Sequence, residues 1–452
     1  LENDEGQTLE VTFRVYNDGI AFKYGLKAIS DEEHIINEYT AYALPQGSKR
    51  WIQQYDPGYE KFFPLSTDGK LANRPEVDLW GYPALIEPRD SVFVLITEAN
   101  IRRGHCGSFL YNGDNRDNYQ VRLGDKKLAF SGVWESPWRL LIAGSLADIT
   151  ESTLVTDVSD PSKVEDTEWI KPGMVSWIYW AYNHGSQDYQ IVKEYIDLAV
   201  KMKWSYDWID WEWDVMRNGG NIQDAVKYSL SQGVKPLVWY NSSTNWIGPG
   251  PLFRLNKKAD REKEYKWLSD MGVAGIKVDF FSGDSVSTMN YYIDLLEDAV
   301  KYKLMLNFHG ATIPRGWQRT YPHMMSVEGV YGAEWYNNTP VLTNRAAEHN
   351  ATLPFTRNVV GPMDYTPGTF SDSQHPHITS YGHELALPII FESALQHMPD
   401  RPSVYYDMPE PVKKLLSDLP AAWDDTKLLT GYPGMEVVMA RRKGDVWYIA
   451  GI

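Results

Sequence analysis

The chain has 452 residues, which is enough for two or three domains with substantial cores. Its formal net charge of −16 argues against nucleic acid or an anionic membrane surface as a partner, because phosphate groups would be repelled. No apolar run approaches the roughly 20 residues of a membrane-spanning helix, so no membrane span is expected. The single cysteine, Cys106, excludes an intrachain disulfide framework and a multi-cysteine metal site.

Residues 1–168 are predicted to form an N-terminal β-sandwich. Alternating runs such as Val11–Tyr16 and Ser91–Thr97 are separated by Asn-Asp-Gly and Pro-Gly turns, a pattern typical of antiparallel sheets. The first residues lack the basic start and apolar core of a signal peptide. Because both ends of the chain resemble strands in mid-course, we expect a trimmed fragment whose sandwich is incomplete at its start.

Residues 169–400 are predicted to form a catalytic (β/α)8 TIM barrel. Amphipathic stretches such as Asp188–Met202 and Ser287–Lys301 alternate with short apolar runs, as in that fold. A doubly wound open sheet is the alternative, but no Gly-rich phosphate-binding loop follows any predicted strand. The expected strands lie at 174–180, 206–213, 235–240, 274–280, 303–308, 322–330, 355–363 and 387–391.

Residues 401–452 resume helix and strand signals. They are predicted to contain the end of the barrel and the beginning of a C-terminal β-sheet domain.

The stretch Gly275–Phe281 carries the first candidate for catalysis. It places Asp279 at the end of a short apolar run, where the strands of a barrel present catalytic side chains. Alternation along a strand points Lys277 to the same side, and a neighbouring cation would keep the carboxylate ionised. The simpler alternative for Lys277 is a structural ion pair at the barrel end.

A second acidic cluster, Glu328-Gly-Val-Tyr-Gly-Ala-Glu334, follows the sixth expected strand. One carboxylate to attack and another to donate a proton are what glycoside hydrolysis requires. Clustered carboxylates also suit a hard cation such as Ca²⁺, although solvated loop acids are the commoner case. HExxH, GxSxG and EF-hand patterns are absent from the sequence, which leaves zinc hydrolases, serine hydrolases and EF-hand proteins without support.

Several longer motifs resemble those of glycoside hydrolase family 97, a family of calcium-dependent α-glycosidases, and they span nearly the whole chain. They are Trp51-Ile-Gln-Gln-Tyr-Asp-Pro-Gly-Tyr-Glu60, Ser136-Pro-Trp-Arg139, Asn307-Phe-His-Gly310, Pro314-Arg-Gly-Trp-Gln-Arg-Thr-Tyr-Pro322, Glu328-Gly-Val-Tyr-Gly-Ala-Glu334 and Gly361-Pro-Met-Asp-Tyr-Thr-Pro-Gly368.

The resemblance implies a retaining mechanism. Inverting members of the family carry base glutamates after strands 3 and 5, and this chain has Asn241 and Gly310 there. They carry glycine at the strand-4 position, where this chain has Asp279. By resemblance, Asp279 is the nucleophile of a retaining α-galactosidase and Glu334 is the general acid/base.

The resemblance also implies Ca²⁺, with Glu60, Glu328 and Glu334 as ligands. The glutamate that the inverting branch supplies at position 310 is missing, so the ligand shell differs in at least one position. Glu334 then has two conflicting roles, because a cation lowers a carboxyl pKa whereas a general acid needs it raised.

The expected substrate is an oligosaccharide with terminal α-linked galactose. The candidate sugar-binding residues are Lys277, His309, Asp364, Trp180, Trp239 and Asn241. The alternatives are a β-L-arabinopyranosidase with the same mechanism, an inverting α-glucosidase and a non-catalytic carbohydrate-binding fragment. The family implies a periplasmic or secreted location, and a monomer is expected.

Overall fold

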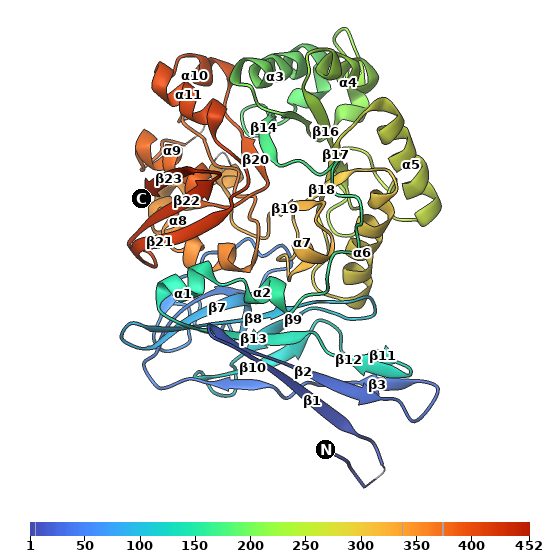
Figure 1. Cartoon of the computed structure of the whole chain (residues 1–452), viewed down its shortest axis with the longest axis vertical. Coiled ribbons are helices and arrows are strands. Elements are labelled where there is room, and N and C mark those ends of the chain that lie inside the picture. Colours follow the sequence, from blue (N-terminus) through green and yellow to red (C-terminus); the bar gives the residue numbers. More distant parts are fainter. Residues whose placement is uncertain (5, 337, 373–374) are drawn as a thin grey trace.

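The computed structural model describes residues 1–4, 6–336, 338–372 and 375–452. A parallel barrel forms the centre of the molecule. A large antiparallel sheet lies below it in the view of Figure 1, and a small C-terminal sheet lies at its left side.

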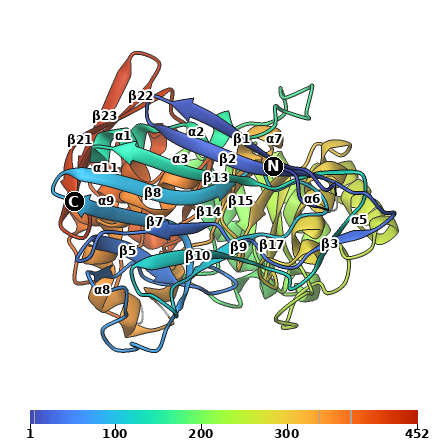
Figure 2. The same ribbon diagram turned by 90° about the horizontal axis from the view of Figure 1, so that it is seen from below.

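The N-terminal sheet is antiparallel, with the strand order β1-β2-β13-β8-β7-β9-β10-β4, and β12, β5 and β6 pair off this path (Figure 2). A separate pair is formed by β3 and β11. The strands are β1 Leu9–Tyr16, β2 Gly19–Lys27, β3 Glu33–Ile35, β4 Ala41–Ala43, β5 Lys49–Gln54, β6 Leu65–Ser66, β7 Leu79–Arg89, β8 Val92–Ala99, β9 Ser108–Tyr111, β10 Asn118–Leu123, β11 Leu128–Phe130, β12 Val133–Glu135 and β13 Trp138–Gly144.

The barrel strands are parallel and follow the order β19-β18-β17-β16-β15-β14-β20, which leaves the barrel nearly closed. All are fully buried except for the first residue of β16, as expected for parallel strands covered by helices. They are β14 Gly173–Trp177, β15 Tyr206–Ile209, β16 Lys235–Asn241, β17 Gly275–Asp279, β18 Met305–Phe308, β19 Met324–Val327 and β20 Leu395–Met398.

The TIM-like barrel confirms the predicted fold class, but two of the expected strands were wrong. Residues 355–363 form the 3₁₀ turns η4 (Leu353–Phe355) and η5 (Arg357–Val360). The prolines at 354 and 362 explain this difference, because proline cannot donate to a strand ladder. The extended segment that follows lies between β19 and the segment before β20, where the barrel sheet is open. Two single hydrogen bonds hold it there, from Met363 N to Glu392 O (2.8 Å) and from Asp364 N to Val327 O (3.0 Å).

Residues 387–391 belong mostly to helix α9 (Tyr381–Ile390), which begins at the N-cap Ser380, and the last strand is β20 instead. A short apolar run reads equally well as a buried helix or a buried strand.

Helices cover the outside of the barrel (Figure 1). In α3, the predicted apolar face is buried, with Val192, Tyr195 and Ile196 among its members, and Asp188 caps its start. The helices are α1 Leu146–Glu151, α2 Leu154–Asp157, α3 Tyr189–Met202, α4 Ile222–Ser231, α5 Lys258–Met271, α6 Val286–Val300, α7 Trp317–Thr320, α8 Pro340–Asn350, α9 Tyr381–Ile390, α10 Pro402–Tyr406 and α11 Glu410–Asp418. Further 3₁₀ turns are η1 Gly185–Gln187, η2 Trp213–Val215 and η3 Ala333–Tyr336.

A fully buried arginine joins the N-terminal sheet to the barrel loops. Arg315 donates to Glu98 Oε1 (2.7 Å) and to the Tyr59 hydroxyl (2.8 Å), and it lies 3.2 Å from Asp284 Oδ1. Tyr59 in turn donates to Asp284 Oδ2 (2.6 Å). Because Tyr59 directly precedes Glu60, this network holds the Glu60 loop against the barrel.

The C-terminal sheet consists of β21 Asp425–Tyr432, β22 Glu436–Lys443 and β23 Val446–Gly451 in antiparallel order. It packs against α1 of the N-terminal part and against α9 of the barrel.

Candidate active site

The two predicted catalytic carboxylates, Asp279 and Glu334, line the same cavity, which has a volume of about 290 Å³. It lies at the carboxyl ends of the barrel strands, where catalytic side chains of this fold gather. Aromatic rings make up most of its wall. The lining residues are Tyr179, Asp210, Trp211, Trp239, Trp246, Lys277, Asp279, Phe280, Glu334, Trp335 and Asn338.

Asp279 is the last residue of β17, and two donors hold its carboxylate. Trp239 Nε1 donates to Oδ2 (3.1 Å) and the Phe280 amide donates to Oδ1 (2.8 Å). Phe280 has a φ of +68°, a left-handed conformation that non-glycine residues seldom adopt. Such conformations cluster at active sites because the surrounding structure has to enforce them.

Gly310 leaves room for Asp279. A Cβ atom at position 310 would lie 3.0 Å from Asp279 Oδ1 and 2.9 Å from the Phe280 amide nitrogen. Contacts this short would force the carboxylate or its backbone to move. A carboxylate at 279 and any side chain at 310 therefore compete for the same space, which gives a steric reason for finding aspartate and glycine together in this chain.

We expect Gly310→Ala to lower kcat by about 10- to 100-fold, because displacing a reacting group by about 1 Å has an effect of this size. Gly444→Ala is the matched control: its φ of +56° is close to the +48° of Gly310, but no atom lies within 4 Å of the added Cβ. Kinetics and thermal melts of both variants separate the steric effect on Asp279 from the strain of a side chain at positive φ. Equal kcat values for the two variants would contradict the steric argument.

Lys277 pairs with Asp210 rather than with Asp279. Its Nζ lies 3.3 Å from Asp210 Oδ2 and 4.6 Å from the centre of the Trp177 ring. Trp177 Nε1 also donates to Asp210 Oδ2 (2.7 Å). Burial lowers the pKa of Lys277, but the charges of Asp210 and Glu334 outweigh it and leave the pKa above its ordinary value. A buried ammonium with three donors and one carboxylate partner has hydrogen-bonding capacity left for a ligand.

Burial gives the two catalytic candidates different pKa values. It raises the pKa of Asp279 to about 6, against the lowering influence of Lys277 and His309. It raises the pKa of Glu334 to about 8, with Lys277 lowering it and Glu328 raising it further. At neutral pH this arrangement provides one ionised and one protonated carboxyl group, which is the distribution that an acid–nucleophile pair requires.

His309, Glu328 and Glu334 form a group that could hold a metal ion, since one donor atom from each lies within 4.8 Å of the others. Glu328 also accepts a hydrogen bond from the Gly310 amide (2.7 Å). Burial first, and then the charges of Glu328 and Glu334, raise the pKa of Glu60 well above its ordinary value. Crowded carboxylates of this kind fit a cation, because a bound cation relieves their mutual repulsion.

The third predicted ligand, Glu60, lies beside this group but outside it. Its Oε2 accepts a hydrogen bond from Trp335 Nε1 (2.7 Å). The N-terminal sheet domain thus places a carboxylate against Trp335 of the cavity wall, and the role of Glu60 as a ligand stays a prediction.

His309 belongs to a buried network behind the cavity. Its Nε2 lies 2.7 Å from Asp364 Oδ2, and His397 Nδ1 lies 2.8 Å from Asp364 Oδ1. Burial lowers the pKa of His309, but Glu328 and Asp364 raise it well above its ordinary value. The neighbouring carboxylates therefore favour the protonated form of the ring. Asp364 lies on the extended segment that occupies the gap between β19 and β20.

Of the predicted sugar-binding residues, Lys277 and Trp239 line the cavity, whereas Trp180, Asn241, His309 and Asp364 lie outside the lining. The side chain of Asn241 is held in a turn: its Nδ2 donates to Trp246 O (3.1 Å) and its Oδ1 accepts from the Ser243 amide (2.7 Å).

Five aromatic residues of the cavity wall were not predicted. They are Tyr179, Trp211, Trp246, Phe280 and Trp335. The first four lie within five residues of the end of a barrel strand, and Trp335 lies on η3, beyond β19. The abundance of aromatic residues near strand ends was the available signal.

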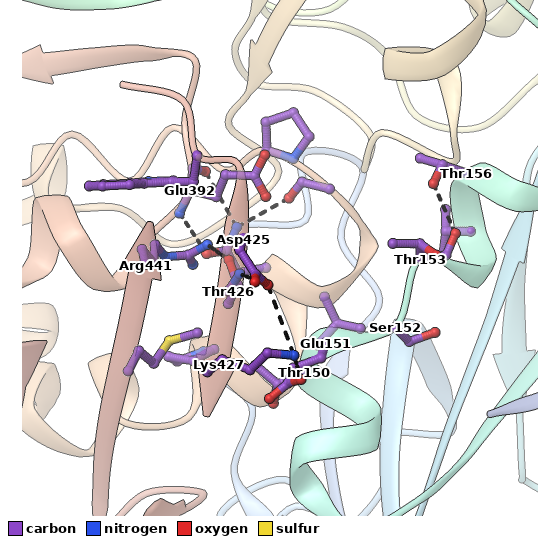
Figure 3. Close-up of a pocket in the computed structure, with 18 of the residues that line it drawn as sticks. Thr150, Glu151, Ser152, Thr153, Thr156, Glu392, Asp425, Thr426, Lys427 and Arg441 are labelled. Atoms are coloured by element: carbon purple, nitrogen blue, oxygen red, sulfur yellow. Dashed lines mark hydrogen bonds and ion pairs between the residues drawn. The ribbon is translucent and has the colours of Figure 1, made fainter. Parts of the chain in front are cut away.

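A second cleft of about 430 Å³ lies where α1, η5, β21 and β22 meet (Figure 3). On the wall of this cleft, Arg441 is only 5% exposed. It donates to Ile390 O (2.6 Å) and to Thr426 Oγ1 (2.8 Å). Lys427 Nζ donates to Glu151 Oε2 (2.7 Å), which ties the C-terminal sheet to α1. Because none of the predicted catalytic residues lines it, we interpret this cleft as a junction between domains.

A TIM-like barrel with two carboxyl groups in one small cavity at the carboxyl ends of its strands is the arrangement that glycoside hydrolysis uses. The chain belongs to glycoside hydrolase family 97. The catalytic family model, Glycoside hydrolase 97, matches residues 172–330, the N-terminal model matches 1–161, and a model described as C-terminal, oligomerisation matches 422–452. The description of the last model argues against the expected monomer.

Two curated relatives are retaining α-galactosidases by name. A probable retaining α-galactosidase of Streptomyces bingchenggensis is 34% identical, with 100% of this chain and 69% of that protein covered. The retaining α-galactosidase of Bacteroides thetaiotaomicron is 29% identical, with 98% and 73% covered.

Among solved structures, a β-arabinopyranosidase superimposes with a TM-score of 0.93 at 30% identity, with 100% of this chain and 76% of that chain covered. A family 97 enzyme from Pseudoalteromonas sp. strain K8 in complex with acarbose has a TM-score of 0.86 at 23% identity, with 99% and 75% covered, and shares the fold. In the part of the chain that the structure describes, no helix is both long and apolar enough to cross a bilayer.

Proposed function

We propose that this chain is a retaining exo-α-galactosidase that depends on calcium. The observation that carries the proposal is that Asp279 occupies the cavity at the point where Gly310 offers no side chain. The Asn241 amide is occupied by backbone partners, so neither of these positions provides a base to activate water. A carboxylate that attacks the sugar directly is then required for turnover.

The steps follow from the residues of the cavity. The Asp279 carboxylate attacks the anomeric carbon while Glu334 donates its proton to the departing glycosidic oxygen, which leaves a covalent glycosyl-enzyme. Glu334 then takes a proton from water, and that water displaces Asp279 from the anomeric carbon. The Trp239 N–H and the Phe280 amide hold the attacking carboxylate in place during both steps.

The proposed Ca²⁺ ligands are Glu60, Glu328 and Glu334. Oxygen donors suit this hard cation better than the His309 ring, whose protonated form is favoured by its carboxylate neighbours. When bound, the ion would supply positive charge beside the hydroxyl groups of the sugar and the leaving oxygen. Without the ion, burial raises the pKa of Glu334 to about 8, which leaves a margin for the lowering that a bound cation would cause.

The proposed substrate is an oligosaccharide that ends in α-linked galactose. A cavity of about 290 Å³ is at the small end of ligand sites, which span about 300–1,000 Å³. This size suits one terminal sugar ring and supports exo-action. Lys277 and Asp210 offer a donor and an acceptor to its hydroxyl groups.

A β-L-arabinopyranosidase is the second candidate, because the β-arabinopyranosidase structure superimposes with a TM-score of 0.93. This sugar is α-galactose without the hydroxymethyl group. The test compares kcat/KM for the p-nitrophenyl α-D-galactopyranoside, β-L-arabinopyranoside and α-D-glucopyranoside. The proposal requires the galactoside to be the best of the three, and the arabinoside as the best substrate would establish the second candidate.

Three broader expectations are also proposals. The division into 1–168, 169–400 and 401–452 follows the changes of architecture, and limited proteolysis tests it. A periplasmic or secreted location rests on the family alone, and fractionation of the source cells tests it. Sedimentation tests the expected monomer. The C-terminal family model, which is described as an oligomerisation model, favours an oligomer instead.

The pH dependence of kcat/KM should be bell-shaped. Asp279 attacks only when ionised, so activity rises as pH increases through its pKa of about 6. Glu334 donates only when protonated, so activity falls as pH increases through its pKa of about 8. Bound Ca²⁺ favours ionised carboxylates, so in the calcium-loaded enzyme both limbs should lie at lower pH than these values. A flat profile between pH 5 and pH 9 would contradict this assignment.

A further inference from the structure

Trp246 lies at the mouth of the catalytic cavity with 43% of its surface exposed. Its ring meets Phe280 edge-on at a centroid distance of 4.6 Å and lies 5.9 Å from Trp211 at an interplanar angle of 32°. Trp211 in turn stacks against His184, with centroids 5.5 Å apart and an angle of 17°. These three rings, Trp246, Trp211 and His184, form a continuous row of aromatic contacts, and Trp246 and Trp211 line the cavity.

The loop that carries Trp246 is fixed on the barrel. Asn241 Nδ2 donates to Trp246 O (3.1 Å), and the Ser242 amide donates to Asp279 O (2.8 Å). Further along the chain, the Phe253 amide donates to Ser243 Oγ (2.9 Å). The loop is thus tied directly to the residue that attacks the sugar. A ring held in this way loses little conformational freedom when a ligand binds.

Two glycines shape the loop around aromatic rings. A Cβ at Gly248 would lie 1.8 Å from Cη2 of Trp246, so the backbone of Gly248 lies directly on the indole. A Cβ at Gly250 would lie 2.6 Å from Cζ3 of Trp239. With Gly248 covering one side of the Trp246 ring, the exposed surface of that ring is available at the cavity mouth.

The size of the cavity requires a second binding surface. Its volume of about 290 Å³ accommodates one sugar ring, so the ring that leaves must lie outside, at the mouth. Among the aromatic lining residues, Trp246 is the one that is more than one-third exposed. The apolar C–H face of a hexose packs on such a ring, and the polar Asn338 on the same rim is available to its hydroxyl groups.

We propose that Trp246, supported by Trp211, is the binding platform for the leaving sugar, so that this protein acts on galactose linked to another sugar in preference to simple galactosides. The inference rests on the proposed function. It adds the identity of the leaving group, a hexose ring, and the residue that selects it.

The test compares Trp246→Ala with the wild-type chain on two substrates. The leaving group of melibiose is a hexose, whereas that of α-galactosyl fluoride is the fluoride ion. We expect kcat/KM for melibiose to fall by about tenfold or more and kcat/KM for the fluoride to change by less than about threefold. Trp246→Phe should recover part of the loss. Trp447→Ala is the matched control, because Trp447 is 44% exposed and lies on β23, away from the cavity.

Equal losses on both substrates would overturn the inference, since Trp246 would then act by holding Phe280 and Asp279 in place. Unchanged values on both substrates would overturn it as well. If wild-type protein hydrolyses neither galactoside, the proposed function fails instead. In that case the role of Trp246 is tested for a β-L-arabinopyranosidase. The same comparison is then made with a β-L-arabinopyranosyl disaccharide and β-L-arabinopyranosyl fluoride.

Discussion

Asp279→Asn is expected to lower kcat/KM for p-nitrophenyl α-D-galactopyranoside by at least about 10³-fold, because the amide cannot attack the anomeric carbon. Asparagine has nearly the same shape and keeps one acceptor oxygen, so it can accept from either Trp239 Nε1 or the Phe280 amide, and the fold should survive. Steady-state kinetics measure the loss of turnover, and a thermal melt measures the stability of the fold. A loss of less than tenfold would show that another group attacks the sugar.

Asp279→Gly provides a more specific check on the same role. Removing the side chain opens space in the cavity, where sodium azide can enter and attack in place of the carboxylate. Glu334 still protonates the leaving group, so the product should be β-galactosyl azide. Rescue by azide with this stereochemistry identifies Asp279 as the nucleophile, whereas a damaged fold would not respond to azide.

Glu334→Gln is expected to lower kcat/KM for melibiose by about 10²- to 10⁴-fold, since a glutamine cannot protonate the leaving sugar. α-Galactosyl fluoride needs little protonation of its leaving group, so the first step on that substrate should be much less affected. The variant should also lose the alkaline limb of the pH profile that begins at about pH 8.

Glu384→Gln is the matched control for this variant. Burial also raises the pKa of Glu384 to about 8, but this residue contacts Thr369 and Thr379 away from the cavity. Its substitution should leave both limbs and the preference between substrates unchanged. If Glu384→Gln removed the alkaline limb and Glu334→Gln did not, the acid/base assignment would be wrong.

The barrel was largely predictable because its strands are short, continuous apolar runs between amphipathic helices. The prediction failed where a strand was replaced by other structure. Residues 355–363 carry enough apolar side chains for a strand, but Pro354 before them and Pro362 among them remove donors and allow only isolated bonds. The run 387–391 is part of α9, and its length alone did not distinguish a helix from a strand.

The pairing of carboxylates was predictable because Asp279 ends one strand and the Glu328–Glu334 loop follows another. The partner of Lys277 was not. Alternation placed Lys277 on the same side as Asp279, but its ion pair with Asp210 depends on how neighbouring strands are staggered across the barrel. The pKa values were equally out of reach, since burial outweighs the charge of Lys277 at Asp279.

The aromatic wall depends on loop geometry. Trp246 lies five residues beyond Asn241, and its position is set by the turn that Asn241 and Gly248 make possible. A sequence pattern shows that such residues are near the end of a strand, but it does not show which of them face the cavity.

The central claim, attack by Asp279 with retention, is tested most directly by proton NMR of the anomeric region during early hydrolysis of p-nitrophenyl α-D-galactopyranoside with Ca²⁺ present. The two-step mechanism predicts that α-galactose appears first and that the β-anomer grows only through mutarotation. β-Galactose as the first product would contradict it, because water would then attack the anomeric carbon directly.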